Sequence, residues 1–218
     1  MEYPVAQKEP LCPLCTAEGN LFFLNSFYLC STCEGIFRSS NDFLSPKEER
    51  IRYTLHNNNP SASGYRKFSL PLVSAITSVI PPGTQGLDFG SGTQSAASSM
   101  LCEQGYPTEA YDPFFHNDPA LLNKKYNYIF CCEVIEHFQE PRREFLTLFS
   151  LLNPGGSLFC MTQLYSSTIN FPTWYYKNDP THVFFYQENT IKWISRHYGF
   201  SKYLINDRVI RFDKPNDY

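Results

Sequence analysis

The sequence has no long apolar run. Its first ten residues, MEYPVAQKEP, lack the apolar core of a signal peptide. The longest apolar-leaning stretch, from Leu70 to Ile80, is broken by Pro71 and by three hydroxyl-bearing side chains, so it does not read as a bilayer span. We therefore expect a cytosolic protein with no membrane partner.

Charged residues are also scarce. They make up 18% of the 218 residues, and the formal net charge is -3. This balance argues against a broad basic surface of the kind that binds nucleic acid or anionic lipid. The sequence therefore favours a small molecule over a polymer as the substrate.

Aromatic and apolar residues, in contrast, are plentiful. Aromatic residues make up 17% of the chain and hydrophobic residues 42%, which is typical of a packed globular protein. The length allows one full α/β domain with a sizeable core, together with a small additional module.

Four of the eight cysteines fall into two pairs. Cys12 and Cys15 form one CxxC motif, and Cys30 and Cys33 form a second one fourteen residues further on. Because cytosolic thiols stay reduced, metal ligation explains this clustering better than disulfides do. Two CxxC knuckles around a predicted hairpin suit a closed, tetrahedral zinc site with a structural role. Free thiols and a redox-active CxxC are the alternative interpretations.

The remaining cysteines fall within predicted strands or helices. We expect all four to be buried packing residues: Cys102, Cys131, Cys132 and Cys160.

Two helices are predicted after the cysteine module. The first begins at Ser45 and runs to about Leu55, because Ser-Pro-Lys-Glu supplies an N-cap, a proline at the first helical position and a capping box. Apolar residues at helical spacing from Tyr65 to Ile80 predict a second helix, which Pro71 should kink or split. These helices could cover one mouth of a cofactor pocket, with Tyr65 as a contact. A plain packing role explains Tyr65 equally well.

The segment GLDFGSG, from Gly86 to Gly92, places a short apolar strand before a glycine turn and a predicted helix. Gly90 and Gly92 would let the backbone approach a ligand closely, and a helix N-terminus favours an anionic group. About twenty residues later a second strand ends at Asp112, where a carboxylate would meet a ribose diol. These two signals predict a cofactor that contains a nucleoside.

The cofactor is better matched by S-adenosylmethionine than by NAD. The third glycine of the dinucleotide fingerprint is replaced by Ser95, and a methyl donor needs no pyrophosphate cradle. An acid at Asp88, a glycine turn and an acid at Asp112 fit the amino-acid, ribose and adenine parts of S-adenosylmethionine. Packing of strand, turn and helix without a ligand is the alternative.

A buried-type strand, Tyr126 to Cys132, comes next, and Glu133 follows at its carboxyl end. A helix from Arg142 to Leu152 and another strand continue the alternation. This order predicts an α/β fold with a doubly wound, mostly parallel, Rossmann-like sheet. Ligands of such sheets bind at the carboxyl ends of the strands.

Four segments together resemble the motifs of class I S-adenosylmethionine-dependent methyltransferases: GLDFGSG, YDP, CCEVIEHF and LLNPGGSLF. The flanking segments LSPKEERIRYTLHNNN, YDPFF and DPTHVFFYQENTIKWI narrow the resemblance to small bacterial methyltransferases with an N-terminal zinc ribbon. The resemblance covers nearly the whole chain. It implies the reaction class and the cofactor, and no particular acceptor.

The resemblance implies three groups of cofactor contacts: the methionine end at Asp88, Gly90, Ser91 and Gly92, the ribose hydroxyls at Asp112, and the floor of the cleft at Glu133. One departure from the family pattern lies after Asp112. About fourteen residues separate it from the next strand, too few for the usual helix and full third strand. We therefore expect the adenine pocket to be built differently, with Phe114 and Phe115.

His137 and His182 are the candidate catalytic residues. Methyl transfer depends mainly on alignment of the acceptor, and a hydroxyl acceptor also needs a base. His137 follows a strand end, and His182 lies in the segment NDPTH. A purely structural role is the alternative for each.

A divalent metal is a further hypothesis. Glu133, Glu136, His137 and His182 resemble the ExxEH motif plus distal histidine of ubiquinone-pathway O-methyltransferases and small-RNA terminal 2′-O-methyltransferases. The resemblance implies Mg²⁺, Mn²⁺ or Zn²⁺ that orients acceptor oxygens. Alternatively, Glu136 and His137 cap the next helix and pack.

The segment Tyr165 to Tyr186 is rich in aromatic side chains. It could form a lid over a planar or apolar acceptor, or it could be part of the core. The residues in question are Trp174, Tyr175, Tyr176, Phe184, Phe185 and Tyr186.

The predicted organisation is a zinc ribbon over residues 1–40, a helical connector over 41–82 and a class I methyltransferase domain over 83–218. The favoured function is methylation of a small molecule, with oxygen as the favoured atom. A zinc-ribbon adaptor or sensor with a non-catalytic methyltransferase-like domain is one alternative. Methylation of RNA or protein is another, and it would need a basic surface that the composition does not suggest.

Overall fold

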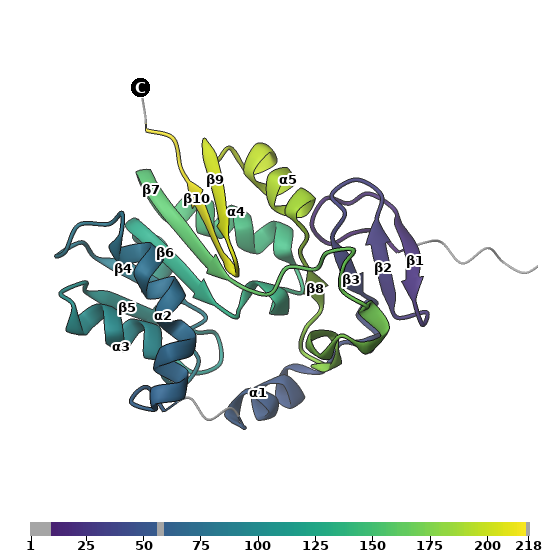
Figure 1. The fold of residues 1–218 in the computed structure, drawn as a ribbon, viewed down its shortest axis with the longest axis horizontal. Helices are drawn as coiled ribbons and strands as arrows, with labels where there is room; N and C mark the ends of the chain where they lie inside the picture. The colour runs from purple at the N-terminus through teal and green to yellow at the C-terminus, as the bar shows by residue number, and fades with distance from the viewer. Residues whose placement is uncertain (1–9, 56–58, 217–218) are drawn as a thin grey trace, which may run out of the picture.

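The computed structural model describes residues 10–55 and 59–216, which contain two β-sheets and five α-helices (Figure 1). The larger sheet has the strand order β5-β4-β6-β7-β10-β9. Its strands are β4 (Gly86–Phe89), β5 (Thr108–Tyr111), β6 (Tyr126–Cys132), β7 (Leu152–Met161), β9 (Lys202–Asn206) and β10 (Val209–Asp213). β5, β4, β6 and β7 are parallel, and β10 is antiparallel to both of its neighbours. The predicted α/β fold is confirmed.

Helices cover both faces of this sheet. α2 (Ser63–Thr77) and α3 (Ala96–Glu103) pack on one face, and α4 (Pro141–Leu151) and α5 (Glu188–Tyr198) pack on the other. β6 shows why: Tyr128 and Phe130 join the apolar cluster of α2 and α3, whereas Ile129 and Cys131 join that of α4 and α5. Because successive side chains of a strand point to opposite faces, a continuous apolar strand needs both layers.

The expected loss of the third strand is also confirmed. Between β5 and β6 the described chain forms only a short 3-10 helix, η2 (Pro119–Asn123), so β5 is the edge strand of the sheet. Leu121 of η2 is buried and its carbonyl accepts a hydrogen bond from the Tyr126 hydroxyl at 3.1 Å. The segment that would normally hold a strand and a helix therefore caps the sheet edge instead.

The smaller sheet contains β1 (Gly19–Phe23), β2 (Phe27–Cys30), β3 (Ile36–Arg38) and β8 (Phe184–Phe185), all antiparallel to their neighbours. The predicted hairpin between the cysteine pairs is β1–β2. β8 comes from far along the chain and completes this sheet by pairing with β3. Cys12, Leu14 and Cys33 belong to the same core cluster as α4 and α5, so the cysteine module packs directly on the main domain.

The aromatic segment before β8 is core rather than lid. Trp174, Tyr176 and Phe185 are buried in one cluster with Phe27 and Ile36 of the small sheet. The interpretation of this segment as a lid is wrong, because its rings supply the apolar contacts that hold the small sheet. Tyr175 differs from the others, with 66% of its surface exposed.

The two connector helices match the prediction with one difference. α1 (Pro46–Thr54) begins with the expected capping box between Ser45 and Glu48. α2 contains Pro71 but continues to Thr77 as a single helix, so it is not split. Pro71 is exposed, and water can therefore satisfy the carbonyl that loses its intrahelical partner.

One cysteine expected to be buried is exposed. Cys102 lies on α3 next to the buried Leu101, on the solvent side of the helix. The prediction assumed that a cysteine inside a helix is buried, whereas only one face of an amphipathic helix is. Cys131 and Cys160 are fully buried, and Cys132 is half-buried.

The domain boundaries at residues 40 and 82 stay a prediction, and residues 1–9 of the predicted ribbon lie outside the described part of the chain. Within residues 10–55 and 59–216, no helix combines the length and apolar character that a bilayer span requires.

Candidate active site

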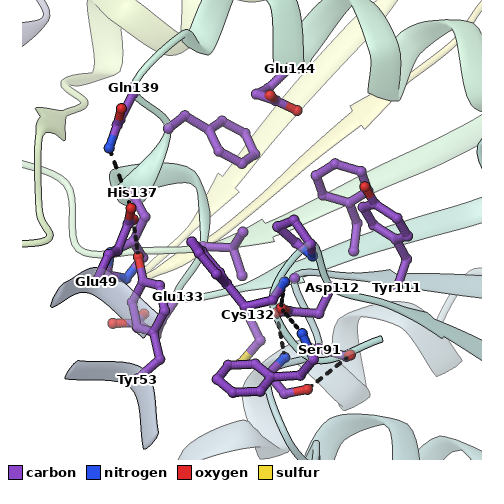
Figure 2. A pocket seen from close by; sticks show the side chains of 18 of the residues that line it. Glu49, Tyr53, Ser91, Tyr111, Asp112, Cys132, Glu133, His137, Gln139 and Glu144 are labelled. Atoms are coloured by element: carbon purple, nitrogen blue, oxygen red, sulfur yellow. Dashed lines mark hydrogen bonds between the residues drawn. The ribbon is translucent and has the colours of Figure 1, made fainter. Parts of the chain in front are cut away.

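A cavity of about 670 Å³ opens at the carboxyl ends of β4, β5 and β6 (Figure 2). It is lined by the loops that follow these strands, over residues 90–92, 111–115, 132–134 and 137–140. Side chains of α1 and α2 close the opposite side. This is the position at which open α/β sheets bind their ligands, and the cavity lies where the sequence predicts the cofactor site.

The glycine turn after β4 approaches the loop after β6 closely. Gly90 has a φ of +86°, and a Cβ atom on it would lie 2.5 Å from Cγ1 of Val134. The amides of Gly90 and Ser91 donate to the carbonyl of Tyr111 at 2.8 and 3.1 Å. A glycine is therefore required at position 90 to bring the turn, the end of β5 and the Val134 loop together.

Asp112 connects two walls of the cavity. Its Oδ2 accepts the amide of Gly92 at 2.9 Å, and its Oδ1 accepts the amides of Phe114 and Phe115 at 2.8 and 3.1 Å (Figure 2). The carboxylate is 7% exposed and faces the cavity together with both phenylalanines. The residues predicted for the ribose and adenine ends of the cofactor thus lie side by side.

Asp88 lies outside the cavity wall. It is 1% exposed, and its Oδ2 accepts a hydrogen bond from the Ser98 hydroxyl of α3 at 2.7 Å. Burial raises the pKa of this carboxyl to about 6. The residue predicted to meet the methionine end therefore supports the glycine turn from the α3 side.

Glu133 lies on the cavity wall at the end of β6, with a φ of +53°. Its carboxylate forms an ion pair with Arg208 at 2.7 Å and accepts a hydrogen bond from the Tyr176 hydroxyl at 3.2 Å. Burial, and then the charge of Glu136, raise the pKa of Glu133 to about 8. Tyr65 of α2 also lines this part of the cavity, as predicted, and burial raises the pKa of its hydroxyl.

His137 and His182 both line the cavity, and their ring centroids are 4.7 Å apart. Nδ1 of His137 lies 3.0 Å from the carbonyl of Thr181, and Nδ1 of His182 lies 2.7 Å from the carbonyl of Tyr176. Because a carbonyl only accepts, each Nδ1 carries a proton, so in a neutral ring the lone pair is on Nε2. Burial lowers the pKa of His182 to about 3, which keeps this ring neutral at physiological pH.

Three of the four residues in the metal hypothesis form a compact group. One ligand atom from each of Glu136, His137 and His182 lies within 4.8 Å of the other two. Glu136 is fully buried, and it accepts hydrogen bonds from the hydroxyls of Thr162, at 3.0 Å, and Tyr176. Glu133 is not in this group, since its carboxylate is paired with Arg208.

The four N-terminal cysteines also come together, with all four sulfur atoms within 4.8 Å of one another. Sγ of Cys12 is 3.6 Å from that of Cys33, and Sγ of Cys15 is 3.2 Å from that of Cys30. Four thiolates bound to one zinc at about 2.3 Å would lie roughly 3.8 Å apart. The residues therefore fit a zinc ion.

Sequence reasoning expected the connector helices to cover the pocket but missed the side chains of α1 that line it. Glu49 and Tyr53 of α1 lie beside Gln139 and His137 on one side of the cavity (Figure 2). It also missed Arg208, which lies between β9 and β10. No local motif marks these residues, because each meets the site through a tertiary contact. Conversely, none of the six aromatic residues proposed for a lid lines the cavity.

A family model for a methyltransferase domain matches residues 61–204. The chain therefore belongs to this methyltransferase family. The sequence prediction of an S-adenosylmethionine-dependent methyltransferase is thus confirmed at the level of family and fold. Among curated proteins, none matches the sequence.

Solved structures share the fold at low sequence identity. The 1,6-didemethyltoxoflavin-N1-methyltransferase of Burkholderia thailandensis, bound to 1,6-didemethyltoxoflavin and S-adenosylhomocysteine, is 11% identical with a TM-score of 0.57 over 88% of this chain and 100% of that one. An O-methyltransferase family protein from the same organism is 13% identical with a TM-score of 0.55 over 78% of this chain, which spans 64% of that protein. A complex of the Haloferax volcanii Trm112 methyltransferase activator with a candidate methyltransferase is 11% identical with a TM-score of 0.56, over 79% of this chain and 96% of the matched one.

Proposed function

We propose that this protein transfers the methyl group of S-adenosylmethionine to a small-molecule acceptor, with oxygen as the favoured atom. The observation that carries the proposal is the junction at Asp112, where one carboxylate ties the glycine turn to the Phe114 loop inside a cavity at the strand ends. Membership of a methyltransferase family supports the reaction class. The bound S-adenosylhomocysteine of the didemethyltoxoflavin methyltransferase supports the cofactor.

In this proposal the cofactor lies along the strand ends. Its methionine end would meet residues 90–92 and Glu133, its ribose hydroxyls would bond to Asp112, and its adenine would lie against Phe114 and Phe115. Asp112 can still accept at Oδ2, which receives only one hydrogen bond in the structure. Asp88 would act indirectly by holding α3 and the turn in place. When bound, the cofactor supplies an electrophilic methyl group to an acceptor aligned with it.

The acceptor would lie on the side of His137 and His182. A neutral imidazole with its lone pair on Nε2 can accept the proton of a hydroxyl acceptor, so His137 or His182 would act as the base. The lowered pKa of His182 makes it the weaker base and favours His137 in this role. The carbonyl of Thr181 would hold the His137 ring in this tautomer throughout. The similarity to an O-methyltransferase family protein is compatible with oxygen as the methylated atom.

A divalent metal ion is the second arrangement we propose for the same groups. Two neutral imidazoles and one carboxylate form a donor set suited to Mn²⁺ or Zn²⁺, and both Nδ1–H groups donate to carbonyls as metal-bound histidines do. Such an ion would orient acceptor oxygens. It would use the Nε2 lone pairs, so it is an alternative to a histidine base.

We also propose that Cys12, Cys15, Cys30 and Cys33 bind a structural zinc ion. Thr16 and Glu34, which follow the second cysteine of each pair, have φ values of +65° and +58°, so both knuckles turn in the same way. The amides of Thr32 and Cys33 point at Sγ of Cys30 at 3.4 Å, which suits a thiolate. A cytosolic location is part of this proposal, because thiolates stay reduced there.

The proposal is tested by calorimetric titration of the zinc-replete protein with S-adenosylmethionine and S-adenosylhomocysteine. We expect micromolar binding of both and a loss of about tenfold or more in Asp112→Ala, because charge-assisted hydrogen bonds are strong. Asp118→Ala is the matched control, since Asp118 also caps a backbone amide but lies away from the cavity.

Two results would redirect the proposal. If neither compound binds the wild-type protein, the proposal that the protein is an enzyme is withdrawn. A zinc-ribbon adaptor or sensor then becomes the leading function. If Asp112→Ala binds like the wild type, the cofactor does not use the junction at Asp112.

A further inference from the structure

The helix α1 faces the cavity with a carboxylate. Glu49 is its one buried residue, with 8% of its surface exposed, and Ile51 and Leu55 point to solvent at 53% and 70% exposure. An amphipathic helix normally buries apolar side chains. A helix that buries a carboxylate instead needs a polar or charged group beside that carboxylate, because burial without one is unfavourable.

Neutral donors hold the Glu49 carboxylate in place. Its Oε1 accepts a hydrogen bond from the Tyr53 hydroxyl at 2.6 Å, and its Oε2 lies 3.4 Å from Nε2 of Gln139. Among the described residues it takes part in no ion pair. A buried carboxylate with neutral partners and no countercharge is costly, and a cation bound beside it would offset that cost.

The charged side chains of the rest of the cavity wall are negative as well. Within the described chain its charged side chains are all acidic, and no lysine or arginine lines it. Most of these acids are already engaged: Asp112 by three backbone amides, Glu133 by Arg208 and Glu140 by Arg143. Glu49 is the most buried of the cavity acids that neither a cation nor backbone amides engage.

Glu49 stands on the acceptor side of the cavity. The Tyr53 ring that bonds to it meets the His137 ring at right angles with centroids 5.3 Å apart, and His137 in turn meets His182. Figure 2 shows Glu49, Tyr53 and His137 together on one side, away from Ser91 and Asp112. The Tyr53 ring also lies 5.6 Å from the ring of Phe114, at the adenine end of the cavity. The Glu49 carboxylate itself meets Gln139, on the side of His137, and we infer that a group bound there belongs to the acceptor.

We propose that the acceptor carries a cationic group, such as a protonated amine, and that Glu49 binds it and thereby determines specificity. The proposal rests on the proposed function, because it assigns the acceptor half of the same cavity. Acceptors whose corresponding group is a phosphate or carboxylate would be repelled by the acidic wall. Tyr53 and Gln139 act as positioning residues that orient the Glu49 carboxylate.

The test uses three phenols that differ in the charge of the side chain: tyramine, 4-ethylphenol and 3-(4-hydroxyphenyl)propionate. Their binding to the full-length, zinc-replete protein is measured by ligand-observed NMR, with and without saturating S-adenosylhomocysteine. We expect tyramine to bind at least about tenfold more tightly than the propionate. Glu49→Gln should abolish the preference, whereas the matched variant Glu140→Gln, at the rim of the same cavity, should keep it.

Three outcomes would overturn the proposal. The first is equal occupancy by the three phenols, absence of binding included. The second is a preference for tyramine that survives in Glu49→Gln while thermal melting shows that this variant is folded. The third is a matching loss of S-adenosylhomocysteine affinity in Glu49→Gln, which would assign Glu49 to the cofactor. Failure of S-adenosylhomocysteine to bind the wild type would instead count against the proposed function, because the tyramine preference is also measured without it.

Discussion

The imidazole rings of His137 and His182 meet edge to face, with their centroids 4.7 Å apart. His137 belongs to the short helix η3 (Ile135–His137) after β6, whereas His182 precedes β8 of the small sheet. Each ring donates Nδ1–H to a backbone carbonyl of the segment 176–181. The segment that leads into β8 thus places a proton on Nδ1 of both histidines, which links the small sheet to the chemistry of the cavity.

The metal hypothesis predicts that the protein binds one divalent ion beyond the structural zinc. Titration with Mn²⁺, followed by electron paramagnetic resonance, should show one bound ion per chain in the wild type. His182→Asn should lose it, because it removes one of three ligands. His197→Asn is the control, since His197 is exposed and stacks on Trp193 outside the cavity. If the wild type and His182→Asn bind Mn²⁺ alike, the two histidines are left with the base role.

The zinc proposal predicts a global effect from a single cysteine. Cys30→Ser should reduce the zinc content seen by native mass spectrometry. It should also lower Tm by about 10 °C or more, because several kcal/mol are lost and each shifts Tm by roughly 2–4 °C at this size. Three of the four cysteines belong to the main core cluster, so the main domain should melt with the module.

The exposed Cys102 provides the control for this experiment. Cys102→Ser should keep both the zinc content and Tm of the wild type. A Cys30→Ser protein that retains a full equivalent of zinc would show that the four cysteines do not form one site.

Asp88 predicts a pH dependence of stability. Its pKa is about 6 in the folded protein and about 3.9 in an unfolded chain, so the folded state holds the proton longer. The contribution of Asp88 to the free energy of unfolding therefore falls by up to about 3 kcal/mol as pH rises from about 4 to about 6. Above that window the contribution is constant. Asp88→Asn can still accept from Ser98 but does not ionise. Its stability relative to the wild type should rise across this window in urea denaturation, and a difference independent of pH would contradict the assignment.

Local signals in the sequence predicted much of the fold. The capping box at Ser45, the glycine turn before α3 and the strand Tyr126–Cys132 depend on neighbours in the chain, and each appears where it was expected. The absent third strand could also be predicted, since fourteen residues cannot hold a helix and a strand. A local sequence pattern cannot show which residues a buried side chain packs against. The sequence therefore left open whether the aromatic segment is a lid or core, and the structure shows that it packs on the small sheet.

The residues of the site, too, could be predicted only where a local motif marks them. Asp112, His137 and His182 were found through motifs, whereas Glu49 and Arg208 carry no motif. Glu49 lies in a charged run, PKEER, that reads as a solvated helix. Its burial follows from how α1 packs across the cavity, and the ion pair between Arg52 and Asp179 that fixes α1 joins residues far apart in the chain.

That ion pair predicts how α1 can be released from the cavity. Arg52 bonds to Asp179 at 2.7 Å. The other contacts of α1 are the weak bond between Glu49 and Gln139 and the half-buried Tyr53 ring, which packs on His137 and Phe114. Arg52→Met should destabilise the closed position of α1 by about 1 kcal/mol, because Arg52 is partly exposed and water screens the pair. Hydrogen exchange of the amides of residues 47–54 should then accelerate about fivefold, while the amides of β6 stay protected. Lys47→Met, on the exposed face of the same helix, should leave the exchange unchanged. Equal exchange in Arg52→Met and the wild type would mean that Glu49 and Gln139 suffice to hold the helix, and α1 would then be a fixed wall of the cavity.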